Sequence, residues 1–169
     1  MKSISLCVVL FATSLLAACG GGGSGVQPML TPKTTASLSF KTTPVSGAPS
    51  APLQALQMTV NLPKGATITD VTKAVTGGSG QLDSSTLSYV VGDPYNTVSF
   101  NVIGGAITLD AVFASIKCNL ATGSALDANS FYTANKPAFP LLIMSGLDSG
   151  GSLVNLVPQI NVTMAVELQ

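Results

Sequence analysis

From residue 36 onward, apolar and polar side chains alternate one for one along several segments of the chain. A period of two is the repeat of an extended strand, whose successive side chains point to opposite faces. Each such segment predicts a half-buried strand with one face on a core and one in water. The apolar series are Ala36, Leu38 and Phe40; Leu56, Met58, Val60 and Leu62; Val98, Phe100 and Val102; and Ile160, Val162, Met164 and Val166.

Turn-forming residues separate these segments. They are PKG at 63–65, GGSG at 77–80, GDP at 92–94, GG at 104–105 and DSGG at 148–151. Short strands at this spacing indicate an antiparallel sandwich or barrel. The composition agrees, because 17 Gly and 10 Pro accompany 46% apolar residues and only 8% charged residues. The sequence therefore predicts an all-β domain.

Two stretches are less clear. Residues 109–120 also fit a helical stripe, but a longer period-two series favours a strand with this series on its buried face. The series is Val112, Ala114, Ile116, Cys118 and Leu120. Residues 126–140 have no alternation, which predicts a loop or a short helix that crosses between sheets.

The N-terminus carries an export signal. Lys2 is followed by an apolar run over residues 4–16 and then by Leu-Ala-Ala-Cys at 16–19. The run is shorter than the roughly 20 residues that span a bilayer and ends in small residues, as a signal peptide does. Because a cysteine follows, the segment resembles the lipobox of bacterial lipoproteins; an ordinary signal peptide with an incidental cysteine is the alternative. The resemblance implies cleavage after residue 18 and acylation of Cys19, which anchors the protein to a membrane without spanning it.

The residues after Cys19 bear on location and domain organisation. In lipoproteins, Asp after the acylated cysteine favours inner-membrane retention, so Gly20 implies the outer membrane of a Gram-negative cell. Residues 19–35, rich in Gly and Pro, are expected to form a flexible tether with a reach of about 20–24 Å. The chain then divides into a signal peptide (1–18), the acylated tether (19–35) and one domain (36–169).

Side chains that carry common chemistry are scarce. The chain has no His, so the commonest general base and metal ligand is missing. Its seven Lys and no Arg form no basic stripe for nucleic acid. The Asp residues are scattered singly, as turn residues are, although a Ca²⁺ site assembled from separate loops stays an alternative. We therefore expect no enzymatic activity, no nucleic-acid binding, no cofactor and no metal.

The cysteines follow from the same argument. Cys7 lies in the signal peptide and Cys19 is the acyl acceptor, which leaves Cys118 as the one free thiol of the mature chain. No disulfide framework is available. Because Cys118 belongs to an apolar series and no His exists to activate it, we expect a buried core residue.

Four segments carry a resemblance to a known family. They are LQMTVNLPKGATITDV, NTVSFNVIGG, DAVFASIKCNLATGS and SGLDSGGSLVNLV. In this order they resemble the strands and turns of a cohesin-like domain of the carbohydrate-binding-module superfamily, over roughly residues 36–166. The resemblance implies a nine-stranded antiparallel jelly-roll β-sandwich. Family members bind a dockerin module of a partner protein or a polysaccharide surface.

Three functions are compatible with these features. The predicted one is a lipid-anchored, non-catalytic module that docks a partner protein through a sheet face, since faces rich in Ser, Thr, Asn and Gln suit hydrogen-bonded contacts. Polysaccharide binding requires exposed aromatic rings, and without Trp the candidates are Tyr95, Phe131 and Tyr132. Phe131 and Tyr132 can instead cap the sandwich edge. The third function is a structural subunit of a surface assembly that pairs through strand edges.

Overall fold

A computed structural model describes residues 32–105 and 107–169. The predicted signal peptide and the acyl acceptor Cys19 lie outside this range. These described residues belong to one compact unit. Within the described residues there are ten strands and two short helices: β1 Thr35–Pro44, β2 Ala55–Pro63, β3 Ala66–Thr67, α1 Val71–Ala74, β4 Val75–Gly77, β5 Gln81–Val90, β6 Tyr95–Ile103, β7 Val112–Leu120, α2 Ala128–Ala134, β8 Leu141–Leu147, β9 Leu153–Asn155 and β10 Ile160–Leu168.

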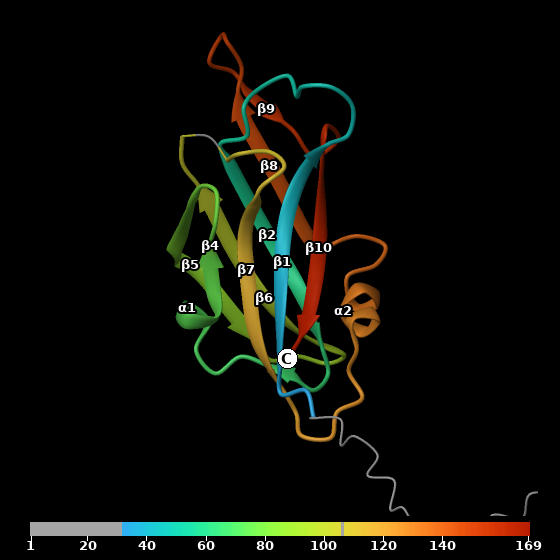
Figure 1. Cartoon of the computed structure of the whole chain (residues 1–169). Coiled ribbons are helices and arrows are strands. Elements are labelled where there is room, and N and C mark those ends of the chain that lie inside the picture. Colours follow the sequence, from blue (N-terminus) through green and yellow to red (C-terminus); the bar gives the residue numbers. More distant parts are fainter. Residues whose placement is uncertain (1–31, 106) are drawn as a thin grey trace, which may run out of the picture. The chain divides into compact units, whose positions relative to one another are not determined.

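The strands form two antiparallel sheets. Sheet A has the order β10-β1-β7-β3, with β4 also paired to β7, and sheet B has the order β5-β6-β2-β8-β9. Figure 1 shows β7, β1 and β10 of sheet A in front of β2, β6 and β8 of sheet B. The chain moves repeatedly from one sheet to the other, with β5–β6 and β8–β9 as consecutive pairs within sheet B, and the two sheets enclose one core. This arrangement is an all-β sandwich.

The alternating segments account for the central strands. Along β1 and β2, every apolar residue of the predicted series is buried and its polar neighbours face outward. The side chains of Phe40 on β1 and Phe100 on β6 meet between the sheets with ring centroids 6.2 Å apart. Phe40 also packs on Phe113 and Phe139, at 6.3 and 6.0 Å. Offset and edge-on aromatic packing of this kind stabilises a core beyond the area it buries.

Two details differ from the sequence-based prediction. The resemblance implied nine strands, whereas the described residues form ten, three of which have only two or three residues. The pairing of β1 with β7 shifts register between Phe40 and Lys41. That irregularity turns Val112 outward, with 43% of its surface exposed, and places Phe113 in the core instead. The strand prediction for 112–120 is therefore confirmed, but its buried face is wrong at Val112.

Helix α2 lies in the segment for which a loop or short helix was predicted. Asp127 caps its first turn, accepting a 2.8 Å hydrogen bond from the backbone N–H of Ser130. At the other end, the side chain of Asn135 binds the main chain of β2: Asn61 N–H donates to Asn135 Oδ1 and Asn135 Nδ2 donates to Asn61 O, both at 2.9 Å. Asn135 thus occupies the place of a further paired strand and fixes α2 beside the sandwich.

Candidate functional site

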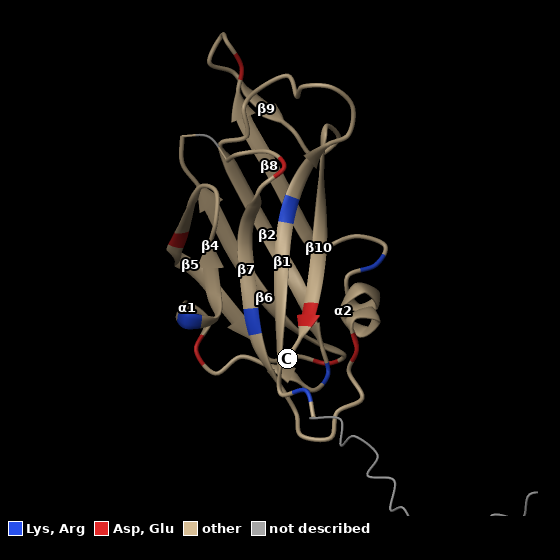
Figure 2. Cartoon of the chain, viewed as in Figure 1, with Lys and Arg blue, Asp and Glu red and all other residues tan. Residues whose placement is uncertain are grey.

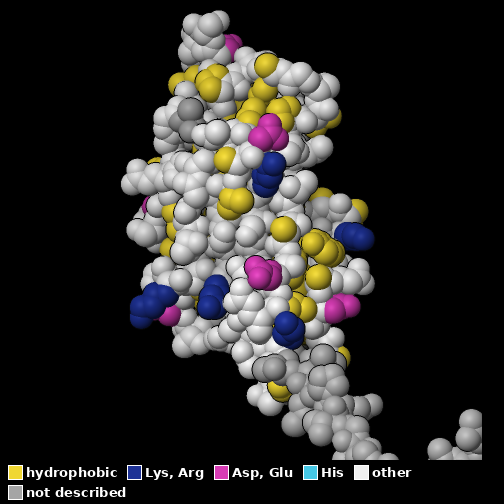
Figure 3. Space-filling model, in the orientation of Figure 1, with side chains coloured by type: hydrophobic (Ala, Val, Ile, Leu, Met, Phe, Trp, Pro, Cys, Tyr) yellow, Lys and Arg dark blue, Asp and Glu magenta, His cyan; other side chains and the backbone are white. Residues whose placement is uncertain are grey.

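The outer face of sheet A is polar and carries charges of both signs. Lys41 on β1, Lys117 on β7 and Glu167 on β10 all lie on it, surrounded by Ser and Thr (Figure 2). The space-filling view from the same side shows few apolar side chains over these strands (Figure 3). Such a solvated face is typical of a sheet turned to water.

The outer face of sheet B has a different character. We define the B face as eleven of the outward-pointing residues of β6, β2, β8 and β9: Gln57, Thr59, Ser99, Asn101, Ile103, Leu141, Ile143, Ser145, Leu147, Leu153 and Asn155. None of these eleven residues is charged; Asp83 on the neighbouring edge strand β5 pairs with Asn101 and lies at the border of the B face. Five are large apolar side chains, with exposed fractions from 37% for Leu141 to 76% for Leu153. The B face therefore combines exposed apolar groups with neutral hydrogen-bonding groups.

The strand register sets the layout of the B face. Gln57 lies between Asn101 on β6 and Ile143 on β8, and Thr59 lies between Ser99 and Leu141. The hydroxyls of Thr59 and Ser99 share a 2.8 Å hydrogen bond. A shallow hollow of about 210 Å³ opens in the middle, lined by Ala55, Leu56, Gln57, Asn101, Ile103, Ile143 and Ser145. The amide groups of Gln57 and Asn101 lie at this hollow and can orient a bound partner.

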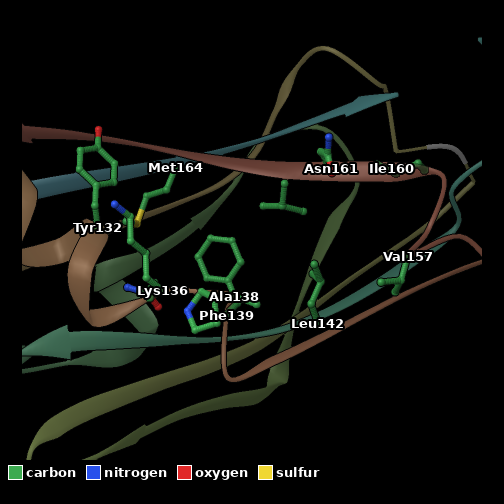
Figure 4. A pocket seen from close by; sticks show the side chains of 12 residues that line it. Tyr132, Lys136, Ala138, Phe139, Leu142, Val157, Ile160, Asn161 and Met164 are labelled. Carbon is green, nitrogen blue, oxygen red and sulfur yellow. The ribbon is translucent and has the colours of Figure 1, made fainter. Parts of the chain in front are cut away.

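A second concavity lies at the side of the sandwich. We call it the side groove; its volume is about 610 Å³ and it is lined by Tyr132, Asn135, Lys136, Pro137, Ala138, Phe139, Leu142, Val157, Ile160, Asn161, Val162 and Met164. These residues come from the end of α2 and the loop after it, from β8, from the connection between β9 and β10, and from the edge strand β10. Figure 4 shows Tyr132 and Lys136 at one end, Val157 at the other, and Phe139 and Leu142 between them.

The structure separates the three aromatic candidates. Phe131 is fully buried on the inner side of α2, so it has no surface on which a sugar ring can stack, and its assignment as a contact residue is wrong. Tyr132, the next residue along the helix, is half-exposed and lines the side groove. Tyr95 is half-buried at the start of β6, opposite Pro63. The three rings therefore form no common platform.

The acidic residues and the cysteine have structural surroundings. The carboxylates of Asp70, Asp83, Asp127 and Asp148 each accept hydrogen bonds from groups within four residues, as turn and cap residues do. No group of three or more metal-ligating side chains occurs among the described residues. Cys118 is buried as predicted, and desolvation raises the pKa of its thiol to about 11. It is therefore a poor nucleophile.

Comparisons of the chain with protein families, with curated proteins and with solved structures found no match. In the part of the chain that the structure describes, no helix is long and apolar enough to cross a membrane.

Both surface features were missed in the sequence, although each left a signal. Strand β8 has the sequence LLIMSGL. Apolar residues occupy both its odd-numbered and its even-numbered positions, which indicates a strand with apolar side chains on both faces. The side groove has a weaker signal, because its lining comes from segments that only the folded topology brings together. Lys136, in the middle of an unpatterned stretch, could not be placed there from the sequence.

Proposed function

We propose that this protein is a non-catalytic binding module that docks a partner protein through the B face. The observation that carries the proposal is the uncharged B face with five exposed large apolar side chains. Contiguous exposed apolar surface bordered by polar groups marks interaction sites on soluble domains. Interface cores are likewise depleted in charged residues.

The size of the B face fits a protein partner. The four strands of the B face, spaced at about 4.8 Å, with a central strand of nine residues, give a surface of roughly 15 Å by 30 Å. That approaches one side of the smaller specific protein–protein interfaces, about 600 Å² per partner. Sheet A has a face of similar extent, but its three charges and hydroxyls favour contact with water.

The proposal includes the cellular setting that the sequence predicts. Cleavage after residue 18 and acylation of Cys19 anchor the domain to the outer membrane through the 19–35 tether, and Gly20 supports that membrane. A jelly-roll of the cohesin-like type belongs to the same proposal. Its support is the pair of antiparallel sheets around one core, together with the resemblance of the strand and turn segments.

Polysaccharide binding is the second candidate function. The amide side chains of Gln57 and Asn101 at the B-face hollow favour it, because amides supply paired hydrogen bonds to sugar hydroxyls. No aromatic ring lines that hollow, so a sugar there has no stacking partner. Protein docking therefore remains the stronger candidate.

The test is site-specific photocrosslinking in cells that produce the full chain. A photoreactive amino acid is placed at Gln57 or Ser145 on the B face, and at Ser39 or Thr163 on the outer face of sheet A as matched controls. We expect one discrete adduct with another protein from the B-face positions and none from the controls. Equal adducts from both faces, or none from either, would overturn the proposal. An adduct between two copies of the chain would favour the surface-assembly function instead.

A further inference from the structure

The core of the sandwich is incompletely covered along β10. The core-facing residues of β1 are fully buried, whereas those of β10 after Ile160 are only half-buried. They are Val162, Met164, Val166 and Leu168. Strand β10 is an edge of sheet A, and the side groove runs beside it. Figure 3 shows apolar side chains gathered at this side of the molecule, between β10 and α2.

We propose that the side groove binds a single-chain amphiphile with a carboxylate head, that is, a free fatty acid. The middle of the groove is lined by Phe139, Leu142, Val162 and Met164, which offer an apolar wall to an alkyl chain. Its volume of about 610 Å³ lies within the range of small-ligand sites. The inference does not rest on the proposed docking function, because the groove and the B face are different surfaces.

Charge complementarity selects the head group. Lys136 is the one cation in the groove lining, and the lining contains no carboxylate. The single ion pair among the described residues joins Lys73 to Asp70, so Lys136 keeps its ammonium group for a ligand. Figure 4 shows Lys136 beside Tyr132 at the α2 end of the groove. A carboxylate bound there accepts a charge-assisted hydrogen bond from Lys136 Nζ, and the chain extends toward Val157.

The other polar groups of the side groove are consistent with a head group bound at the α2 end, beside Lys136. The amide of Asn135 is already committed, since it binds the main chain of Asn61 and the carbonyl of Phe131. The hydroxyl of Tyr132 makes none of the hydrogen bonds found among the described residues, whereas Asn161 lies on the exposed side of β10, nearer to Val157 than to Lys136 (Figure 4). Tyr132 therefore offers a second hydrogen bond to a carboxylate held by Lys136.

A peptide strand is a less suitable occupant. Gln169 exchanges both main-chain hydrogen bonds with Thr35, so in the antiparallel ladder the even-numbered residues of β10 point their N–H and C=O groups away from β1. An added strand needs a continuous run of those groups. Helix α2 packs against β10, and the loop after it, with Lys136, lines the same groove. Helix α2 and this loop therefore occupy part of the edge that an added strand would need.

The test uses the full chain in phospholipid vesicles with a photoactivatable dodecanoate that carries a diazirine at the chain end. After irradiation, peptide mass spectrometry locates the adduct. We expect labelling in the peptides that contain Leu142 or residues 157–164. Unlabelled dodecanoate should compete, and dodecanol should compete about tenfold less well, since it lacks the charge that strengthens the bond to Lys136.

Two exposed lysines provide a matched pair of variants. Lys136→Glu should lower labelling by about tenfold, because it places a like charge at the head group, whereas Lys117→Glu on sheet A should leave it unchanged. A carboxylate in the tail region, Val157→Asp, should also reduce labelling. Equal labelling of the two lysine variants, equal competition by dodecanol, or adducts outside the groove would each overturn the proposal. So would labelling by a photoactivatable diacyl phospholipid with none by the fatty acid.

Discussion

Two buried hydroxyl groups, those of Thr42 and Tyr89, have no hydrogen-bond partner among the described residues. Thr42 is fully buried at the end of the apolar series on β1. A hydroxyl taken out of water without a partner loses its hydrogen bonds and gains nothing in return. At the scale of single residues, these positions cost stability, whereas the capping carboxylates at Asp70 and Asp127 contribute to it.

Thr42→Val should stabilise the fold. Valine has nearly the same shape and is favoured in strands, and it removes the unpaired hydroxyl, so the free energy of unfolding should rise by about 1 kcal/mol. Urea unfolding followed by circular dichroism measures the change. Thr43→Val, on the half-exposed side of the same strand, is the control and should change the free energy by less than about 0.5 kcal/mol. A destabilised Thr42→Val would show that the hydroxyl has a partner.

Asp70 gives stability a defined dependence on pH. Hydrogen bonds from Thr72 and Lys73 lower the pKa of its carboxyl from 3.8 to about 2. A group with a lowered folded-state pKa contributes stability that is present above its unfolded pKa and is lost as pH falls through the folded pKa. Between about pH 4 and pH 2, wild type should therefore lose stability that Asp70→Asn has already lost at neutral pH. The melting temperatures of wild type and Asp70→Asn, measured at a series of pH values, should become equal in that window. A constant difference between the two melting temperatures down to pH 2 would contradict the assignment.

At the scale of elements, Asn135 makes the connection on which the side groove depends. Its side chain binds both main-chain groups of Asn61 and the carbonyl of Phe131. Asn61 returns a hydrogen bond of 2.8 Å to the carbonyl of Ala134. These bonds lie where β8 no longer pairs with β2, beyond Thr59. They hold the end of α2, and with it one end of the groove, against sheet B.

Asn135→Ala should destabilise the domain by about 2–4 kcal/mol, because it leaves two partly buried main-chain groups of Asn61 and the buried carbonyl of Phe131 without partners. Chemical denaturation measures the loss, and the amide of Asn61 should also exchange hydrogen faster. Asn119→Ala is the matched control: it removes an exposed amide that binds only the Thr69 hydroxyl, and its effect should stay within about 0.5 kcal/mol. Equal losses of stability in the two variants would show that the hydrogen bonds of Asn135 to Asn61 and Phe131 have no special role.

The sequence predicts strands best where one face of the strand is buried and the other is exposed to solvent. That condition holds for β1, β2 and β6, whose alternation is complete. Strand β5 was missed because it is an edge strand with a register irregularity between Asp83 and Ser88, and its residues are exposed or half-buried along both faces. Val112 was misplaced by the β1–β7 irregularity, which depends on a strand distant in the sequence.

The candidate site was less accessible to sequence reasoning than the fold. A sheet face is the sum of alternate residues from several strands, so it cannot be assembled until the strand order is known. Phe131 and Tyr132 are adjacent in the sequence, yet the helical rotation between them sends one into the core and the other into the groove. Neither outcome follows from residue type alone.

At the scale of the described domain, chemistry is divided between surfaces. Sheet A presents charges and hydroxyls to water, the B face presents neutral apolar and amide groups, and the side groove combines an apolar wall with one lysine. A sandwich permits this division, because each sheet has its own outer face and the open edges lie between them. The N-terminal anchor is a separate proposal with a separate test.

Metabolic labelling with an alkyne analogue of palmitate tests the anchor. Wild type and Cys7→Ala should both incorporate the label, because the proposal places Cys7 in the part of the chain that is removed by cleavage after residue 18. Cys19→Ala should incorporate none and should keep its signal peptide, since cleavage in lipoproteins follows acylation. The mass of the N-terminal peptide distinguishes the two forms. Label retained in Cys19→Ala, or lost in Cys7→Ala, would contradict the lipobox assignment.

Docking through the B face predicts that a charge placed on that face weakens binding and that a charge placed on sheet A does not. The most direct measurement is the dissociation constant of the crosslinked partner for two charge substitutions at exposed strand positions, Ile143→Asp on the B face and Ala165→Asp on sheet A. Burial of an unpaired carboxylate in an apolar contact costs at least about 2 kcal/mol, so Ile143→Asp should bind about thirtyfold more weakly while Ala165→Asp binds as wild type. Unchanged binding by Ile143→Asp with loss of binding by Ala165→Asp would contradict the account.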